Sequence, residues 1–287
     1  NSNGQLGNGT TTDSLFPVQV SGAGGAGLLS DVKAVAAGYG HTLALKNDGT
    51  VLAWGYNSNG QLGNGTTTDS LFPVQVSGAG GAGLLSDVKA VAAGYGHTLA
   101  LKNDGTVLAW GYNSNGQLGN GTTTDSAVPI QLSGLSSVTA IVAGNYHCAA
   151  LRYEITYIGV LAWGKNTNGQ LGNGTTTDSA VPIQLSGLSS VTAVAAGNDH
   201  TAVLLSDGTL RAWGSNSNGQ LGNGTTIDSA VPVQVSGLSS VTAVAAGNED
   251  TFALRTDNSV WAWGNNSNGR LGNGTSTSYR STPEQVQ

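Results

Sequence analysis

Short runs of alternating apolar and polar residues recur along the chain, bounded by glycines or by an Asp-Gly pair. Residues 97–101 read His-Thr-Leu-Ala-Leu and residues 106–110 read Thr-Val-Leu-Ala-Trp, with Asp104-Gly105 between them. Alternation at period two predicts β-strands, and Asp-Gly accepts the positive φ angles of a tight hairpin turn. These two segments therefore predict an antiparallel hairpin.

Two further strands flank each such hairpin. Residues 88–94 are a run of small residues before it, and residues 128–132, Val-Pro-Ile-Gln-Leu, follow it after a long polar loop. Proline has no amide hydrogen for an interior ladder, so the strand that contains it is expected at a sheet edge. Nothing in the unit has the period of a helix. The chain is predicted to be all-β, with four-stranded antiparallel units.

This pattern repeats about every 50 residues. Ala-Trp-Gly tripeptides recur at spacings of 56, 53, 50 and 50, with the tryptophans at Trp54, Trp110, Trp163, Trp213 and Trp263. Four antiparallel strands per repeat describe the blade of a β-propeller. One blade cannot bury its own faces, so each tryptophan is expected to have a structural role between neighbouring blades.

We expect a single propeller domain over residues 1–287, with five blade units that start near residues 32, 88, 138, 191 and 241. Residues 1–31 are a partial repeat that is expected to supply an outer edge strand. The first three strands occur five times and the fourth occurs six times.

Three arrangements fit this count. Residues 14–21 close a five-bladed ring onto the last unit, or residues 283–286 complete that unit and leave 14–21 for a neighbouring molecule, or the units belong to a larger array. A closed five-bladed ring is favoured, because unpaired strand edges are a liability.

The repeats are unusually alike. Residues 1–70 are identical to residues 57–126 at every position, which indicates a recent tandem duplication or deliberate design. The chain has no methionine and starts within a repeat. We therefore expect that Asn1 is not a translational start and that the chain begins at a cut within an array.

One combination of motifs resembles a known family. Gly-x-x-His-Thr-x-Ala-Leu, then Asp-Gly, then Ala-Trp-Gly-x-Asn-x-x-Gly-Gln-Leu-Gly is similar to the regulator-of-chromosome-condensation repeat, over essentially the whole chain. The resemblance implies a β-propeller, typically of seven blades. Its members include a chromatin-bound nucleotide exchange factor, plant ultraviolet receptors and bacterial β-lactamase inhibitors, so it implies protein binding as a class and no particular partner.

Charge narrows the classes of partner. Charged residues make up 9% of the chain, the net charge is −6, and no basic stretch is present, which argues against nucleic acid. No apolar run approaches the roughly 18 residues of a membrane span, so membrane insertion is not expected. Cys148 is the single cysteine. Few charges and many Asn, Thr and Gly favour a secreted or cell-surface bacterial protein without fixing the compartment.

Signals for catalysis are weak. Four histidines share one repeat offset, where the fifth unit has Asp250; they are His41, His97, His147 and His200. Equivalent positions on different blades lie too far apart for one ion, so a structural role is expected. The Asn-rich loop lacks the carboxylates of a calcium site and is expected to be a turn held by side-chain-to-backbone bonds. We predict no catalytic residue, metal or cofactor, and no enzyme.

Departures from the repeat suggest a binding face. The loops at 22–31 and 78–87 are six residues longer than their counterparts, and the hairpin at 153–159 is three residues longer. Antiparallel alternation places all three on one face. The candidate partner-binding residues there are Leu28, Leu29, Leu84, Leu85, Tyr153, Glu154, Ile155, Tyr157 and Ile158.

The opposite face offers an alternative site. Tyrosines gather on the first three units, at the turn after the first strand and after Trp-Gly, and acids occupy the turn in the last two units. The candidates are Tyr39, Tyr56, Tyr95, Tyr112, Tyr146 and Lys165.

The leading hypothesis is a non-catalytic protein-binding or scaffold propeller that holds an unidentified protein partner on one loop face. One alternative is a multivalent lectin, in which near-identical blades give equivalent glycan sites. Another is an engineered or duplication-derived repeat protein with no specific ligand. Terminal edge strands also allow a homo-oligomer.

Overall fold

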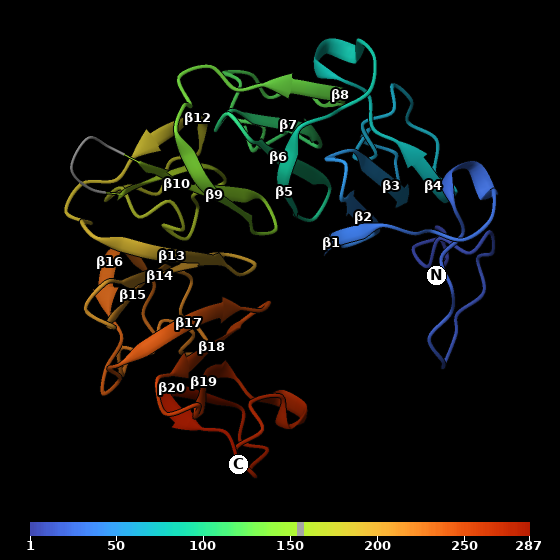
Figure 1. Cartoon of the computed structure of the whole chain (residues 1–287). Helices are drawn as coiled ribbons and strands as arrows, with labels where there is room; N and C mark the ends of the chain where they lie inside the picture. The colour runs from blue at the N-terminus through green and yellow to red at the C-terminus, as the bar shows by residue number, and fades with distance from the viewer. Residues whose placement is uncertain (154–157) are drawn as a thin grey trace. The chain divides into compact units, whose positions relative to one another are not determined.

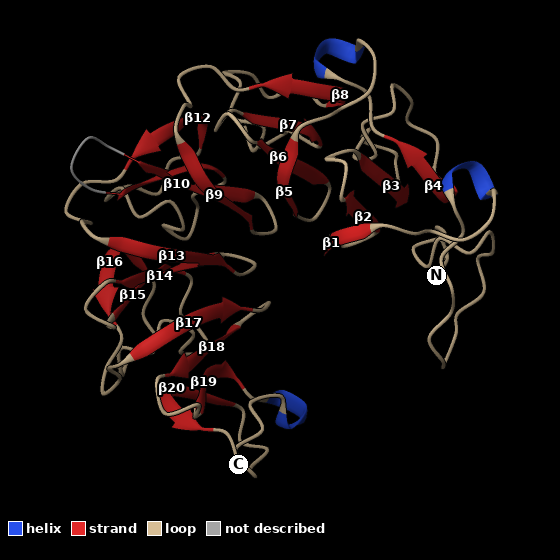
Figure 2. Ribbon diagram, in the orientation of Figure 1, coloured by secondary structure: helices blue, strands red, loops and turns tan. Residues whose placement is uncertain are grey.

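The computed structural model describes residues 1–153 and 158–287. Strands form most of its regular structure, with short 3-10 turns at Ala23–Gly25, Ala79–Gly81 and Ser267–Gly269 (Figures 1 and 2). The expected all-β class is confirmed. Two compact units are distinguished, residues 1–143 and residues 144–287.

Within the described residues, twenty strands form five four-stranded sheets, and neighbours in each sheet are consecutive in the chain. The first sheet contains β1 (Val32–Ala37), β2 (His41–Lys46), β3 (Val51–Gly55) and β4 (Ser70–Gln75). The second contains β5 (Val88–Ala93), β6 (His97–Lys102), β7 (Val107–Gly111) and β8 (Ser126–Gln131). The third contains β9 (Val138–Ala143), β10 (His147–Tyr153), β11 (Ile158–Gly164) and β12 (Ser179–Gln184).

The last two sheets belong to the second unit. The fourth contains β13 (Val191–Ala196), β14 (His200–Leu205), β15 (Leu210–Gly214) and β16 (Ser229–Gln234). The fifth contains β17 (Val241–Ala246), β18 (Asp250–Arg255), β19 (Val260–Asn265) and β20 (Tyr279–Gln285).

The predicted Asp-Gly hairpin joins the second and third strands. In the first sheet, the Asp48 carboxylate accepts the amide of Thr50 at 2.9 Å, and Gly49 takes a φ of +81°, which a glycine adopts without strain. The amide of Asn47 also donates to the carbonyl of Asp31 at 2.8 Å. The loop before the first strand and the hairpin turn therefore lie on the same face, as antiparallel alternation predicts.

A buried asparagine organises the long loop between the third and fourth strands. The Asn57 side-chain amide donates to the carbonyls of Thr66 and Thr68 at 3.0 and 2.9 Å, while its oxygen accepts the amide of Leu62 at 2.9 Å. Asp69 accepts the amide of Asn57 at 2.8 Å. The expected turn with side-chain-to-backbone bonds is confirmed, and it presents Leu62 to the core.

The loop of one sheet is fastened to the next sheet. The carbonyl of Gln61 accepts bonds from the Trp110 indole at 2.9 Å and from the Thr98 hydroxyl at 3.0 Å. Trp110 is buried in an apolar cluster with Leu45, Leu62 and other residues of both sheets. A tryptophan therefore both fills and hydrogen-bonds the boundary between blades.

The same fastening recurs in the second unit. Trp263 and Thr251 donate to the carbonyl of Gln220, both at 2.9 Å, and Trp263 is fully buried in a cluster with Leu204 and Leu221. Because the same residue types occupy equivalent positions in both units, the sequence repeat produces the same interface between successive blades.

The N-terminal half-repeat docks in the same manner but lacks a sheet of its own. The carbonyl of Gln5 accepts the Trp54 indole at 2.8 Å and the Thr42 hydroxyl at 3.1 Å. Residues 14–20 that follow form no strand.

The fourth place in the last sheet is filled by β20, which pairs with β19. Of the three arrangements that fit the sequence, the one in which 14–21 complete that sheet is therefore not the one found. Closure of a five-bladed ring stays a prediction.

Candidate functional site

The first candidate face carries the long loops before β1 and β5. Leu28 and Leu84 are exposed there, whereas Leu29 is half-buried against Trp54, and Leu85 is buried in the core cluster. In each Leu-Leu pair, only the first leucine is thus available to a partner. Leu85 stabilises the fold instead, because the loop folds back to bond its amide to the carbonyl of Val76.

The hairpin at 153–159, which was predicted to share this face, belongs to the second unit, and residues 154–157 of it lie outside the described residues. Tyr153 ends β10 and is exposed. Glu154, Ile155 and Tyr157 lie outside the described residues, and Ile158 begins β11. Their contribution to a binding face stays a prediction.

The opposite face brings the turn after the first strand to the residue after Trp-Gly. The amide of Tyr56 donates to the carbonyl of Gly40, and the amide of Tyr112 donates to the carbonyl of Gly96, both at 2.8 Å. Each tyrosine side chain lies close to its glycine: a Cβ added at Gly40 would lie 3.0 Å from the Cβ of Tyr56. Glycine at these turns therefore leaves room for the side chains of Tyr56 and Tyr112.

Three of the predicted tyrosines meet in one hollow of about 470 Å³ within the first unit. Its lining comes from two neighbouring blades and the N-terminal half-repeat: Ser2, Asn3, Gln5, Tyr39, Gly40, Tyr56, Asn59, Tyr95 and Gly96. We call it the tyrosine hollow. Tyr112 lies next to it across Gly96, while Tyr146 and Lys165 belong to the second unit.

A stacked pair of rings forms one wall of the tyrosine hollow. The ring centroids of Tyr39 and Tyr95 are 4.4 Å apart with an interplanar angle of 23°. Tyr39 is exposed, and its amide donates to the carbonyl of Gly94 on the next blade at 3.3 Å. The pair offers aromatic surface together with hydroxyl groups, a combination that is favoured in binding sites.

A buried donor beside this wall has no partner. The Gln61 side chain is fully buried, its oxygen accepts the amide of Asn59 at 3.0 Å, and its nitrogen Nε2 has no hydrogen-bond partner. Nε2 lies 3.9 Å from the position that a Cβ on Gly96 would take. Leaving a buried donor unsatisfied costs free energy.

The second unit shows what such an acceptor looks like. Gln170, which matches Gln61, donates its Nε2 to the carboxylate of Asp199 at 2.8 Å, and Asp199 stands where the second blade has Gly96. Lys165 also pairs with Asp199 at 3.1 Å and lies 5.6 Å from the Tyr146 ring centroid. In the second unit the position next to the glutamine is occupied by Asp199, which is paired with Lys165. In the first unit the matching residue is Gly96, which has no side chain.

Sequence reasoning found the tyrosines but not Gln61, Asn3, Gln5 or Asn59. The asparagine recurs in every copy of the repeat and the glutamine in every copy but the last, which has Arg270, so neither stands out individually. The available signal was Gly96, because the matching residue between the third and fourth blades is Asp199. The donor Gln61 recurs along the chain, but its acceptor is absent at Gly96, and this difference is not visible when each residue is considered alone.

Three of the four histidines bond to a threonine of the next blade. His41 Nε2 bonds with the Thr98 hydroxyl, His147 with Thr201 and His200 with Thr251, each at 3.0 Å and each buried. Burial lowers the pKa of His41 and His147 to about 4 and that of His200 to about 3. His97 is also buried.

Other features of the described part carry little chemistry. Cys148 is buried, and this burial raises the pKa of its thiol. A search of the described residues finds no group of three or more His, Cys, Asp or Glu placed to hold a metal. None of the helices in the same part of the chain is long and apolar enough to span a membrane.

Curated relatives of the chain are longer than the chain itself. The ultraviolet-B receptor UVR8 of Arabidopsis thaliana is 36% identical over 212 residues, which cover 72% of this chain and 46% of the receptor. The human probable E3 ubiquitin-protein ligase HERC6 is 37% identical over 188 residues, which cover 62% of this chain and 18% of that protein. The chain spans less than half the length of either.

Solved structures share the fold. Human WBSCR16 is 26% identical with a TM-score of 0.80, over 99% of this chain and 76% of that one. Yeast RCC1 (Prp20), in its complex with Kap60, is 23% identical with a TM-score of 0.77, over 89% of this chain and 61% of that one. The family profile described as the RCC1-like domain matches residues 1–287. The chain therefore belongs to the family of RCC1-like domains, and its four-stranded sheets are β-propeller blades of that family.

Proposed function

We propose that this chain is a non-catalytic protein-binding scaffold and that the tyrosine hollow is a docking site for a segment of its partner. The observation that carries the proposal is the unsatisfied Gln61 Nε2 beside the exposed Tyr39–Tyr95 stack. Family membership supports protein binding as the class, and yeast RCC1 is known in complex with the protein Kap60.

The chemistry of the hollow defines the segment it would accept. An acceptor oxygen on a ligand would satisfy Gln61 Nε2, and the Asp199 carboxylate, which accepts a bond from Gln170 at the matching position of the second unit, supports a carboxylate as that acceptor. The tyrosine stack adds a flat surface for an apolar side chain. The preferred segment thus presents an acidic residue next to an apolar or proline residue.

The second unit argues against equivalent sites on every blade. The matching position there is occupied by Asp199 and Lys165, so the hollow is not repeated unchanged. A lectin that gains avidity from identical pockets would need the same residues in each. Protein binding at one distinctive site is therefore the function that we favour.

A peptide selection tests this proposal. Displayed random peptides selected on the chain should be enriched in acidic residues, and Tyr39→Ala or Tyr95→Ala should weaken the selected peptides at least tenfold, the loss expected for an interface hot spot. Tyr279→Ala, an exposed tyrosine of the fifth sheet, is the matched control and should change nothing.

A second variant separates the missing acceptor from general damage. Gly96→Asp gives Gln61 an internal partner like that of Gln170, so it should abolish peptide binding. The added Cβ would lie 3.3 Å from the Cβ of Tyr112, so a small loss of melting temperature is expected with it. A glycan array is run in parallel on the same variants. Sugar binding that depends on Tyr39 together with no peptide selected would contradict the proposal and favour a lectin.

A further inference from the structure

A second hollow lies between the fourth and fifth sheets, within the second unit. Its volume is about 470 Å³, and its walls come from β13, β14 and β17 and from the hairpin turn at 206–208. Leu204 and Val241 are buried apolar residues of this lining, and Asp207 is an exposed acidic one. We call it the boundary hollow. It lies on the side of the two sheets that carries the hairpin turns and the loops before the first strands.

Backbone bonds fix the two walls of the boundary hollow. The amide of Val241 donates to the carbonyl of Gly208 at 3.1 Å and so ties the start of β17 to the hairpin turn of the fourth sheet. The Thr192 hydroxyl donates to the carbonyl of Leu204 in its own sheet at 3.2 Å. This short side chain is therefore bonded within the fourth sheet and does not cross to the fifth.

A lysine crosses the matching boundary in the first unit. There the amide of Val138 donates to the carbonyl of Gly105 at 3.2 Å, so the backbone is joined in the same way as in the second unit. Lys89 stands at the repeat position of Thr192, and its Nζ donates to the carbonyl of Val138 at 3.4 Å. The lysine side chain thus spans from β5 to β9.

Two repeat positions lose an ammonium group in the second unit. Thr192 replaces Lys89 and Leu205 replaces Lys102, and both replacements line the boundary hollow. The carbonyl that accepts the bond from Lys89 has its counterpart in Val241, which shares its repeat position and its amide bond to a glycine. The boundary hollow therefore lies where the chain itself places a lysine side chain in the first unit.

A negative charge lies at the rim of the boundary hollow. The Asp207 carboxylate accepts the hydroxyl and the amide of Thr209 at 2.7 and 2.9 Å. These bonds lower the pKa of Asp207, with a smaller effect from Arg211. The carboxylate is therefore ionised at neutral pH and can attract a cation.

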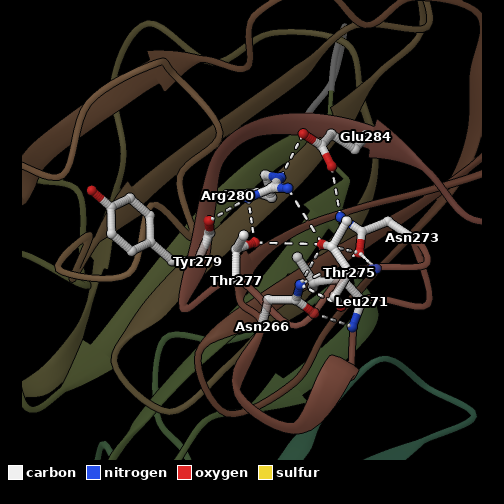
Figure 3. A network of polar contacts seen from close by, with 8 residues as sticks. All are labelled: Asn266, Leu271, Asn273, Thr275, Thr277, Tyr279, Arg280 and Glu284. Carbon is white, nitrogen blue, oxygen red and sulfur yellow. Dashed lines mark hydrogen bonds and ion pairs between the residues drawn. The ribbon is translucent and has the colours of Figure 1, made fainter.

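The arginines of the fifth sheet are engaged in ion pairs of their own. These pairs are Arg255 with Asp257 at 3.2 Å, Arg270 with Asp250 at 3.9 Å and Arg280 with Glu284 at 2.5 Å. Figure 3 shows the last pair within a network that also includes Asn273 and Thr275. The net charge of the chain is −6, so the surroundings of the boundary hollow also favour a positively charged partner.

We propose that the boundary hollow binds a lysine side chain of a partner protein. The aliphatic stem packs on Leu204 and Val241, and the ammonium group is received by the carbonyl of Val241 and the carboxylate of Asp207. This inference adopts the protein-binding class of the proposed function and adds a site of the opposite charge preference. The two sites share no residue and lie in different units.

Lysine is the side chain that the observations favour. The repeat itself places Lys89 at this position in the first unit. An ammonium group is a compact charge that a single carbonyl can accept, whereas a guanidinium is a planar fork that suits two acceptors side by side. The aliphatic stem suits apolar walls, because a lysine buries its stem while its charged head stays in water.

Amide NMR shifts of the full chain test the inference. The probes are blocked Gly-Gly-X-Gly-Gly peptides in which X is lysine, arginine or norleucine, the last having an aliphatic stem without the ammonium group. The lysine peptide should shift the resonances of Gly208, Val241 and Thr242 and saturate in the millimolar range. The norleucine peptide should not. Absence of these shifts, equal shifts with norleucine, or tighter binding of the arginine peptide would each overturn the proposal.

Two variants locate the binding. Thr192→Lys supplies the side chain that Lys89 supplies in the first unit, so it should abolish the shifts and leave the melting temperature unchanged. Asp207→Asn keeps the turn, because Asn-Gly suits the same hairpin, and should weaken binding by about threefold, as for an exposed ion pair. Asp104→Asn, the same change in the second sheet, is the matched control and should change nothing. Wild-type binding by folded Thr192→Lys would show that the boundary hollow is not the site.

The two proposed sites can fail separately. Tyr39→Ala should leave the shifts caused by the lysine peptide intact, and Asp207→Asn should leave the binding of selected acidic peptides intact. Loss of the lysine response in Tyr39→Ala would place that response at the tyrosine hollow and contradict the inference.

Discussion

Acidification from pH 7 to pH 5 should lower the free energy of unfolding by roughly 2 kcal/mol for each of three buried histidines, a total of about 6 kcal/mol. His41 and His147 have pKa values of about 4 in the folded chain and His200 of about 3, against 6.5 for an ordinary histidine. Burial is the main cause, because it penalises the charged imidazolium.

The sign follows from proton uptake. Below pH 6.5 the histidines of the unfolded chain bind protons, whereas those of the folded chain remain neutral until about pH 4. The stabilisation is thus complete above pH 6.5 and is lost as the pH falls toward 4. Hydrogen bonds from Thr50 and Thr106 lower the pKa values of Asp48 and Asp104 from 3.8. The stability that these carboxylates contribute is therefore lost only when the pH falls below 3.8. Burial raises the pKa of Asp250, so this group favours the folded state at low pH and disfavours it as the pH rises.

Urea unfolding at several pH values measures this dependence. His200→Gln should make the slope between pH 6.5 and pH 5 shallower by about 1.4 kcal/mol per pH unit, whatever it does to the stability at pH 7. A slope that is the same in the variant and the wild type would show that His200 titrates normally in the folded chain.

Trp263→Ala should lower the free energy of unfolding by about 3–5 kcal/mol, the usual cost of emptying a fully buried aromatic position. Trp263 fills the boundary between the fourth and fifth sheets, in one cluster with Leu204 and Leu221. Its indole bond to the carbonyl of Gln220 is also lost, but that carbonyl keeps the bond from Thr251. Packing therefore dominates the loss.

The same strand supplies the matched control. Trp261 is two residues away in β19, is only half-buried, and bonds to Ser259 within its own hairpin. Trp261→Ala should cost less than half as much as Trp263→Ala in thermal or urea unfolding. Equal losses would mean that the tryptophan of the repeat does not hold neighbouring blades together.

The repeat made most of the fold predictable. Strand, turn and edge assignments rest on local chemistry, such as Asp48-Gly49 in a hairpin or Pro73 in an outer strand. The Asp-Gly turn recurs in the second and fourth sheets, and a proline lies in the outer strand of each sheet. The faces of the loops followed from antiparallel alternation. The same reasoning placed Leu85 on a binding surface, because the sequence does not show which leucine of a pair turns inward.

The candidate site was less accessible to sequence reasoning. Tyr39, Tyr56 and Tyr95 were named from their repeat positions, and the structure brings them into one hollow. The partnerless nitrogen of Gln61 was not foreseen, because it results from what the next blade fails to provide at Gly96. Such a gap appears only when side chains from separate repeats are placed together.

The sequence by itself therefore determined the blade: its strands, its turns and the tryptophan between blades, since neighbours in the chain decide these features. Only the tertiary structure decided which of two identical segments forms a strand. Residues 14–20 and 70–76 have the same sequence, yet 70–76 pair with β3, whereas Leu15 and Phe16 are exposed and no described strand lies beside them. A β-strand depends on a partner that its own sequence does not contain.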